Sequence, residues 1–270
     1  MKIITNSIGA TATSMTAAGS GIADASGYSM ENVVSGPRST MYRSAATTSP
    51  IRVAYNYSAA MDADHMVIAR ADKLLTAGTM KLTGKAKNSG GTWIDNPGAA
   101  IKDPIAVGDL VGPPVGTKTT GQDFVYDFGS TQSYYGFGIQ AQTKGGTAEA
   151  LMVSKVYFGM GIDLGDPEAG AQWENVGAKD RFLVPPRGSF QYETEKQITL
   201  VWKFLSKSTV NSFLYSTANV LNWPVFLYDP NQYLWAWKLE HVLVAGWQLT
   251  LMGPDLYQLA IGFRRLKHYD

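Results

Sequence analysis

Short stretches in which apolar and polar residues alternate recur through the first half of the chain. Residues 51–55 read Ile-Arg-Val-Ala-Tyr, and residues 137–141 read Phe-Gly-Ile-Gln-Ala. Alternation with a period of two is typical of strands that bury one face. Gly, Pro and Asn cluster between these stretches, as at residues 88–91 and 144–146, and such clusters favour turns. We predict an antiparallel β-sandwich of the jelly-roll type, with strands at residues 51–55, 64–70, 79–83, 124–128, 135–142 and 151–158.

The second half of the chain combines strands with one helix. Residues 198–204 alternate as a strand, and Ser206 then offers a hydroxyl N-cap for a helix that we expect to reach about residue 221. Apolar residues recur at helical spacing after this cap: Val210, Phe213, Leu214 and Leu221. Pro224 ends the helix. Further strands are predicted at residues 225–228, 234–238, 239–245, 247–252 and 256–266, so this half is an α+β domain with a β-meander and one helix.

The change of texture between the two halves predicts where the domains meet. Residues 163–180 are rich in Gly, Asp, Glu and Ala and carry little that could pack. The early residues are rich in Gly, Ala, Ser and Thr. We therefore expect an arm over residues 1–20, a sandwich over 21–162, a linker over 163–180 and an α+β assembly domain over 181–270, which makes the protein mainly β.

Composition narrows the class of partner. Charged residues make up only 17% of the 270 residues, and the net charge is +1. This balance provides no field that would steer the chain to nucleic acid or to an anionic membrane, so we expect neither as a partner. No stretch of 18 apolar residues and no signal-peptide core occurs, so we expect a soluble protein made in the cytoplasm. The low surface charge suggests that neighbouring subunits cover part of the surface.

Residues able to carry catalysis or hold a cofactor are scarce. The chain has no cysteine, and its histidines are His65, His241 and His268. None of them belongs to a nucleophile elbow or a zinc-binding pair. We therefore expect no enzyme activity and no cofactor, and a hydrolase acting on cell-wall glycan lacks any residue that could be named as its acid or base. Two aspartate pairs, Asp62 with Asp64 and Asp163 with Asp166, leave Ca²⁺ binding open beside the simpler interpretation that they cap turns.

Aromatic residues are the richest chemical resource of the chain. Trp235 and Trp237 share one face of a predicted strand, and Trp247 follows in the next. Rigid rings bury much area at small entropic cost, which suits subunit interfaces and sugar stacking alike. We predict a subunit interface at Trp235, Trp237 and Trp247, with a buried aromatic core as the alternative. We predict glycan contacts in the sandwich at Trp93, Tyr134 and Tyr135.

A family resemblance adds to this interpretation. Residues 28–44 read Tyr-Ser-Met-Glu-Asn-Val-Val-Ser-Gly-Pro-Arg-Ser-Thr-Met-Tyr-Arg-Ser. The segment resembles the opening of galactose-binding-like (discoidin-type) sandwiches, which often read Asn-Leu-Leu-Asp-Gly and then Trp-Arg-Ser. The matching positions are Asn32, Val33, Val34, Gly36, Ser39, Thr40, Arg43 and Ser44. Tyr42 stands where Trp is usual, and Ser35 stands where Asp is usual, which weakens any metal or ligand role carried over.

The order of later segments resembles that of tail proteins of tailed bacteriophages. Residues 153–159 (Val-Ser-Lys-Val-Tyr-Phe-Gly) resemble the closing strand of such sandwiches in phage virions, and residues 223–230 (Trp-Pro-Val-Phe-Leu-Tyr-Asp-Pro) resemble a turn of the domain that follows. The resemblance covers most of residues 20–268. It implies a tail or tail-tip structural protein, whose C-terminal domain is similar to the modules that build tail rings.

Two functions follow as expectations. The first is a virion structural protein that is assembled in the host cytoplasm, packs against copies of itself and other virion proteins, and displays a domain for host surface glycan. The alternative is a carbohydrate-binding host-adhesion module without a scaffold role.

Overall fold

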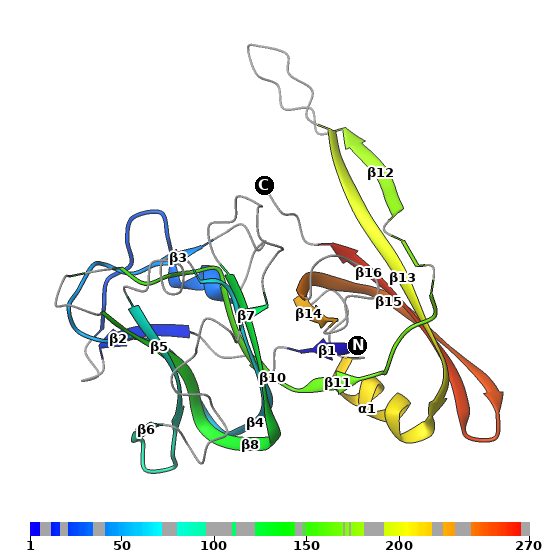
Figure 1. The fold of residues 1–270 in the computed structure, drawn as a ribbon, viewed down its shortest axis with the longest axis horizontal. Coiled ribbons are helices and arrows are strands. Elements are labelled where there is room, and N and C mark those ends of the chain that lie inside the picture. Colours follow the sequence, from blue (N-terminus) through cyan, green and yellow to red (C-terminus); the bar gives the residue numbers. More distant parts are fainter. Residues whose placement is uncertain are drawn as a thin grey trace. The chain divides into compact units, whose positions relative to one another are not determined.

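A computed structural model describes the chain in two compact units built mainly of antiparallel β-sheet (Figure 1). The N-terminal sandwich comprises Ile4–Gly161, and the C-terminal unit comprises Met1–Ile3, Ile162–Ala236 and Glu240–Lys267. The described residues are 1–5, 12–16, 21–34, 41–71, 80–95, 110–111, 122–143, 148, 150–169, 171–172, 174–180, 192–217, 224–229 and 239–265. Within these residues no helix has the length and apolar character needed to cross a bilayer.

The sandwich contains one large sheet, one small sheet and a 3-10 turn. The large sheet has the order β10-β4-β8-β5-β6, with β2 beside β4 and β7 beside β8, and the small sheet is the pair β3-β9. The elements are β2 (Ala12–Thr16), η1 (Met30–Val33), β3 (Tyr42–Arg43), β4 (Ile51–Ala71), β5 (Met80–Lys87), β6 (Trp93–Asp95), β7 (Leu110–Val111), β8 (Gln122–Thr143), β9 (Met152–Val153) and β10 (Lys155–Gly159).

Two long strands supply both layers of this sandwich. The first part of β4 pairs with the last part of β8, and the second part of β4 pairs with the first part of β8, with register shifts between Asn56 and Met61 and between Ala63 and His65. β-bulges bend a strand and increase its twist. The layer formed by the first part of β4 and the last part of β8 continues into β2, β5 and β6. The layer formed by the second part of β4 and the first part of β8 continues into β10 and β7. The sheet therefore folds back on itself, and the pairs of strands predicted at residues 51–55 and 64–70, and at 124–128 and 135–142, are each one bent strand.

The core of the sandwich lies where the two layers face each other. Phe137 of β8 stacks on Phe158 of β10, with ring centroids 5.2 Å apart, and Tyr55 of β4 meets Phe158 edge-on at 6.2 Å. The Tyr55 hydroxyl donates a hydrogen bond of 2.6 Å to the Val156 carbonyl. Burial raises the pKa of Tyr55 well above its usual value, so this hydroxyl stays a neutral donor. The sandwich predicted from period-two alternation is confirmed at the level of fold class.

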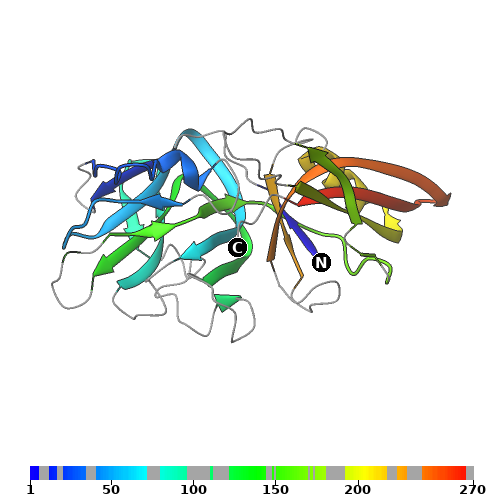
Figure 2. The ribbon, with the colours of Figure 1, turned by 90° about the horizontal axis from the view of Figure 1, so that it is seen from above.

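The C-terminal unit is a seven-stranded sheet of order β11-β1-β14-β15-β16-β13-β12. Its strands are β1 (Lys2–Ile4), β11 (Gly161–Asp163), β12 (Glu174–Asp180), β13 (Tyr192–Ser206), β14 (Pro224–Tyr228), β15 (Leu239–Gly253) and β16 (Leu256–Arg265). β15 and β16 form a long hairpin, orange and red in the figures, whose turn lies far from β1 and β14 (Figure 2).

One helix, α1 (Lys207–Thr217), packs on one face of this sheet. Its start is fixed by the predicted cap, because the Ser206 hydroxyl accepts a hydrogen bond of 3.2 Å from the Thr209 backbone N–H. Val210 and Phe213 are buried in the core of the unit, as their helical spacing predicts. The part of the expected helix beyond residue 217 and the strand expected at residues 234–238 lie outside the described residues.

The ends of the two units differ from the sequence-based boundaries. Residues 1–20 are expected to form an arm, but β1 lies in the C-terminal sheet between β11 and β14, and β2 pairs with β4. Residues 163–180 are expected to form a linker, but they contain the end of β11 and all of β12. Both segments gain backbone hydrogen bonds at a sheet, and Ile3 is fully buried, which their small-residue composition does not reveal.

Candidate functional site

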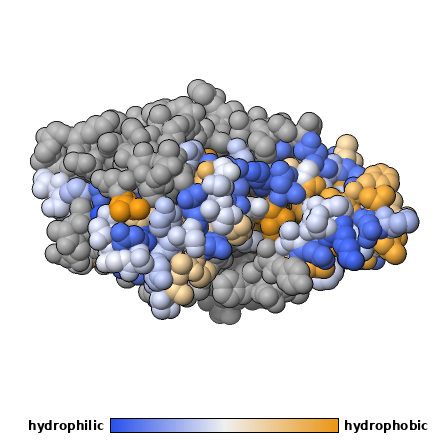
Figure 3. Space-filling view, turned by 90° about the horizontal axis from the view of Figure 1, so that it is seen from below, coloured by the Kyte–Doolittle hydropathy of each residue, from blue (hydrophilic) through white to orange (hydrophobic). Residues whose placement is uncertain are grey.

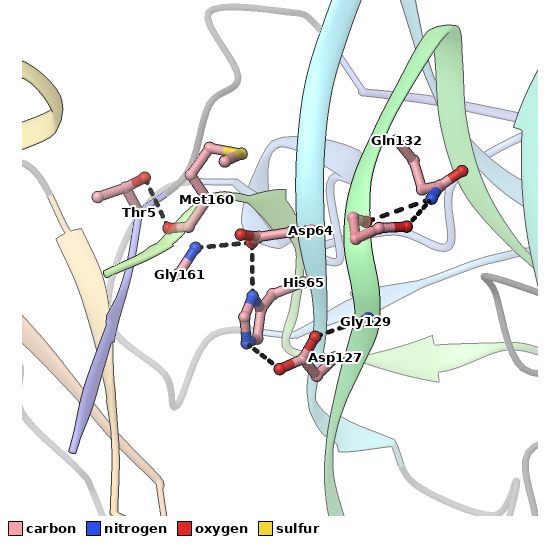
Figure 4. A network of polar contacts seen from close by, with 9 residues as sticks. Thr5, Asp64, His65, Asp127, Gly129, Gln132, Met160 and Gly161 are labelled. Carbon is pink, nitrogen blue, oxygen red and sulfur yellow. Dashed lines mark hydrogen bonds and ion pairs between the residues drawn. The ribbon is translucent and has the colours of Figure 1, made fainter. Parts of the chain in front are cut away.

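The most connected polar group of the sandwich centres on His65, which is only 3% exposed (Figure 4). Its Nδ1 lies 2.5 Å from Asp64 Oδ1, and its Nε2 lies 3.4 Å from Asp127 Oδ2. Asp64 and His65 are neighbours in sequence, and the register shift before His65 lets both side chains join one network. An imidazole flanked by carboxylates on both sides can donate to both only when it is protonated.

This network binds segments of the sandwich together. Asp64 Oδ1 also accepts a hydrogen bond of 2.7 Å from the Gly161 backbone N–H, and Asp127 Oδ1 accepts one of 2.8 Å from Gly129. A Cβ at Gly161 would overlap the imidazole ring, so the chain passes directly against His65. Nearby, the Thr5 hydroxyl donates to the Met160 carbonyl at 3.2 Å.

The network is not arranged for nucleophilic catalysis or for metal binding. Asp127 occupies the ring nitrogen that would accept a proton from a nucleophile, so the Asp64–His65 pair has no vacant base position facing a hydroxyl of the described residues. No group of three or more metal-ligating side chains with suitable geometry occurs among those residues. Asp163 instead accepts from the Gly165 backbone N–H at 2.9 Å, as an aspartate that caps a turn does.

A second buried polar group holds the segment that carries the family resemblance. Lys155 of β10 is fully buried, and its ammonium donates to the Asn32 carbonyl. Tyr157, two residues along the same face, donates from its hydroxyl to the Val34 carbonyl at 3.0 Å. Asn32 in turn donates from its side chain to the Met41 carbonyl at 2.7 Å. Burial lowers the pKa of Lys155 to about 7 and raises the pKa of Tyr157 above its usual value.

Trp93, a predicted glycan contact, lies on the outer face of the sandwich. It pairs across strands with Lys87, and Cβ atoms at Gly136 and Gly138 would lie 3.2 and 3.4 Å from its ring. The Arg52 guanidinium lies 5.0 Å from the ring centroid, at cation–π distance. Trp93 is half-buried, so its ring covers the two glycines of β8 and leaves only part of its surface to a ligand.

The two predicted tyrosine contacts have different surroundings. Tyr134 packs edge-on against Phe137, with ring centroids 5.7 Å apart, and lies partly buried against the core. Tyr135 is 36% exposed. The described residues show no ring contact between Trp93 and either tyrosine, so the prediction of one shared glycan site at Trp93, Tyr134 and Tyr135 stays a prediction.

Large apolar side chains are exposed mainly in the C-terminal unit (Figure 3). Of the seven exposed large hydrophobic residues in the described part of the chain, five belong to β13, β15 and β16. They are Phe204, Trp247, Leu251, Met252 and Leu256. The sequence pattern places these residues in strands but does not reveal that they reach solvent. Exposed apolar side chains concentrated in a few strands are a common feature of interaction surfaces.

Only one of the three predicted interface tryptophans is described. Trp247 is 37% exposed and meets Phe213 of α1 edge-on, with ring centroids 6.4 Å apart, so it faces the helix-covered side of the sheet. Trp235 and Trp237 lie outside the described residues. The predicted role of these three tryptophans in a subunit interface stays a prediction.

Comparisons with known proteins identify only distant structural neighbours. No family model and no curated protein matches the chain. Chitosan-binding module 1 from a chitosanase/glucanase of Paenibacillus sp. IK-5 is 14% identical, with 57% of this chain and 97% of that chain covered and a TM-score of 0.39. The family 32 CBM of C. perfringens NanJ, solved with galactose, is 12% identical, with 58% and 98% covered and a TM-score of 0.38.

A module of the same kind, CBM32-1 from a family 31 glycoside hydrolase of Clostridium perfringens, is 14% identical, with 55% and 93% covered and a TM-score of 0.36. At this distance the matches carry no conclusion about what this chain binds. Its own residues have to supply that argument.

Proposed function

We propose that the chain is a structural protein of a bacteriophage tail, which assembles with copies of itself through its C-terminal unit. One observation carries the proposal: Met252 and Leu256 are both at least 40% exposed on the neighbouring strands β15 and β16. Apolar surface exposed to water is costly and is removed when subunits associate. The resemblance of residues 153–159 and 223–230 to segments of tail proteins supports the tail as the assembly.

Self-association and location in the particle test this proposal separately. Sedimentation velocity of the purified chain from 1 to 200 µM should show a species larger than the monomer, and immunogold labelling should mark the tails of particles from cells that encode the chain. A monomer at every concentration, together with unlabelled particles, would refute the structural role.

A second function, contact with carbohydrate by the sandwich, is favoured by one specific pair of features. Tyr135 is 36% exposed, and the half-buried ring of Trp93 lies against glycines of the same strand, β8. Aromatic rings that keep part of their surface in solvent suit stacking on sugars. This contact can coexist with a structural role, because it uses the other compact unit.

A glycan array of the full chain tests the second function. Tyr135→Ala and Trp93→Ala should each lower the signal of any glycan bound by the unmodified protein. Tyr28→Ala is a matched control, because Tyr28 is 37% exposed on the same sandwich. Binding that survives both substitutions, or that is lost equally in the control, would contradict a contact at these rings.

A further inference from the structure

The sheet of the C-terminal unit has one face that no described element covers. Cross-strand partners in β13, β15 and β16 divide the residues into two faces. Ile261 and Leu259 of β16 are fully buried on the face that carries α1. The alternate residues form the other face, which we call the open face: Thr199, Val201, Gly246, Gln248, Thr250, Leu256, Gln258, Ala260 and Gly262, together with Met252, the extra residue at the register shift opposite Leu256. None of these ten residues is buried.

The strand segments that form the centre of the open face carry no charged residue. Residues 198–202, 242–253 and 256–263 contain no Asp, Glu, Lys or Arg. Charged residues border these stretches: Asp255 in the hairpin turn, Arg264 at the opposite end of β16, and Lys203 of β13, which forms an ion pair of 2.5 Å with Glu168. An ordinary solvent-exposed sheet face carries interspersed charges, whereas the centre of a protein–protein interface is depleted of them.

The same face carries both a protrusion and a matching shallow region. Leu256 and Met252, at the turn end, are 40% and 42% exposed. Gly246 and Gly262 are cross-strand partners further along, and a Cβ at Gly246 would meet no atom within 4 Å. Two glycines facing each other leave a patch of bare backbone into which a large side chain of another molecule can pack.

We propose that the open face is an interface between two copies of this chain, packed face to face about a two-fold axis with their strands antiparallel. In this arrangement Leu256 and Met252 of each copy cover Gly246 and Gly262 of the other, and Asp255 of each lies near Arg264 of the other. Shape and charge are therefore complementary between identical surfaces, as an isologous contact requires. The inference rests on the self-assembly proposed above and names the surface that carries it.

The partner is a second copy because each half of the contact is present on the same face. The protrusion and the bare glycine patch are separated along β16 by the six positions from Leu256 to Gly262, roughly 20 Å of strand. Two such faces related by a two-fold axis at Leu259 bring both contacts into register at once. The other exposed leucine of the hairpin, Leu251, pairs with Tyr257 on the helix-covered face and takes no part.

Sedimentation equilibrium of the full chain tests the assignment with variants on opposite faces of one hairpin. Leu256→Lys and Gly262→Val should each raise the dissociation constant of self-association at least tenfold. Leu251→Lys is the control, since Leu251 is 66% exposed, and it should leave the constant within about twofold. Gly262→Val also separates dissociation from unfolding. A Cβ at Gly262 would meet only Gln197 Nε2, at 3.4 Å, and the Gly246 carbonyl, at 3.8 Å, so the substitution fits the folded chain. The urea unfolding midpoint of Gly262→Val should therefore not fall.

The possible results distinguish this inference from the broader proposal. If the unmodified chain is monomeric at 200 µM, both the self-assembly and the open-face interface are wrong. If it self-associates equally in all variants, self-assembly stands and the open face is overturned. If Leu251→Lys disrupts association as strongly as Leu256→Lys, the helix-covered side forms the contact and the inference is likewise overturned.

Discussion

Replacing Lys155 with methionine should remove a pH dependence of sandwich stability that the buried ammonium creates. Burial lowers the pKa of Lys155 from 10.5 to about 7, whereas in the unfolded chain the group keeps its ordinary value. Between these two pKa values the unfolded chain holds a proton that the folded chain does not. Stability therefore rises with pH across this window and is flat below it. From pH 6 to pH 9 the gain is about 2.5 kcal/mol, given about 1.4 kcal/mol for each unit of pKa difference.

Lys155→Met also removes the hydrogen bond to Asn32, but that loss is the same at every pH and shifts the stability without changing its slope. The matched control is Tyr157→Phe, which removes the neighbouring bond to Val34. Burial raises the pKa of Tyr157 further above neutrality, so no proton is exchanged in this range. The stability difference between wild type and Tyr157→Phe should therefore not vary with pH.

The assay follows the oxidation of Met66 by hydrogen peroxide through a urea series, with mass spectrometry of the full chain. Met66 is fully buried in the sandwich core, so it is oxidised when the sandwich unfolds, and the chain has no cysteine to interfere. The midpoint difference between wild type and Lys155→Met should change in favour of wild type as the pH is raised from 6 to 9. A difference that stays constant over this range would refute the reasoning that Lys155 loses its proton in the folded sandwich.

Three further changes have expected outcomes set by single contacts. Gly161→Ala should destabilise the sandwich in the Met66 assay because its Cβ overlaps the His65 ring, whereas Gly21→Ala, with no atom within 4 Å, should not. Ser206→Ala should lower the stability of the C-terminal unit by about 1 kcal/mol, because the Thr209 N–H loses its hydrogen-bond acceptor. Ser206→Asp should retain most of that stability, because its carboxylate can accept the same bond. Urea unfolding followed by tryptophan fluorescence measures both changes. Phe137→Ala should cost about 3–5 kcal/mol of sandwich stability in the Met66 assay, because Phe137 is 1% exposed and contacts four aromatic rings; Tyr135→Ala should cost far less.

The sequence predicts well those features that depend on local periodicity. Period-two alternation identifies most of the long strands of both units, although β1, β2 and β12 fall in segments expected to be an arm and a linker. The hydroxyl of Ser206 marks the helix start to the residue. Alternation is interrupted at Asn56, however, and the interruption predicts two strands where the structure has one bent β4. A bulge and a loop break the pattern in the same way, and only the pairing partner β8 decides between them.

The polar groups of the sandwich depend on contacts between residues far apart in the chain. Lys155 sits in an alternating strand where a lysine is expected to reach solvent, but η1 supplies its carbonyl partner from a segment 123 residues earlier. Asp64 and His65 are adjacent, and adjacent side chains of a regular strand point apart, so their shared network depends on the register shift before His65. Neither arrangement leaves a signal in hydrophobic periodicity.

The exposure of residues near the turn of the β15–β16 hairpin is not predictable for a related reason. The pattern around the turn shows apolar residues on both sides of the strands, which by itself favours burial on both faces. Which face α1 covers depends on the register between β13 and β16, and that register is fixed by a shift between Trp202 and Leu205. The sequence therefore does not show that Leu256 and Met252 face solvent.

Two kinds of unfavourable group in this chain are compensated in different ways, and the difference bears on function. Lys155 and His65 are ionisable groups in buried positions, and carbonyls and carboxylates of the sandwich itself contact them. Leu256 and Met252 are apolar groups in water, and no described residue of the chain covers them. The free-energy cost of burying Lys155 and His65 is offset by contacts within one molecule, so it requires no partner. The second cost would be relieved by the self-association proposed above, so the C-terminal sheet, rather than the polar network of the sandwich, is where that proposal is tested.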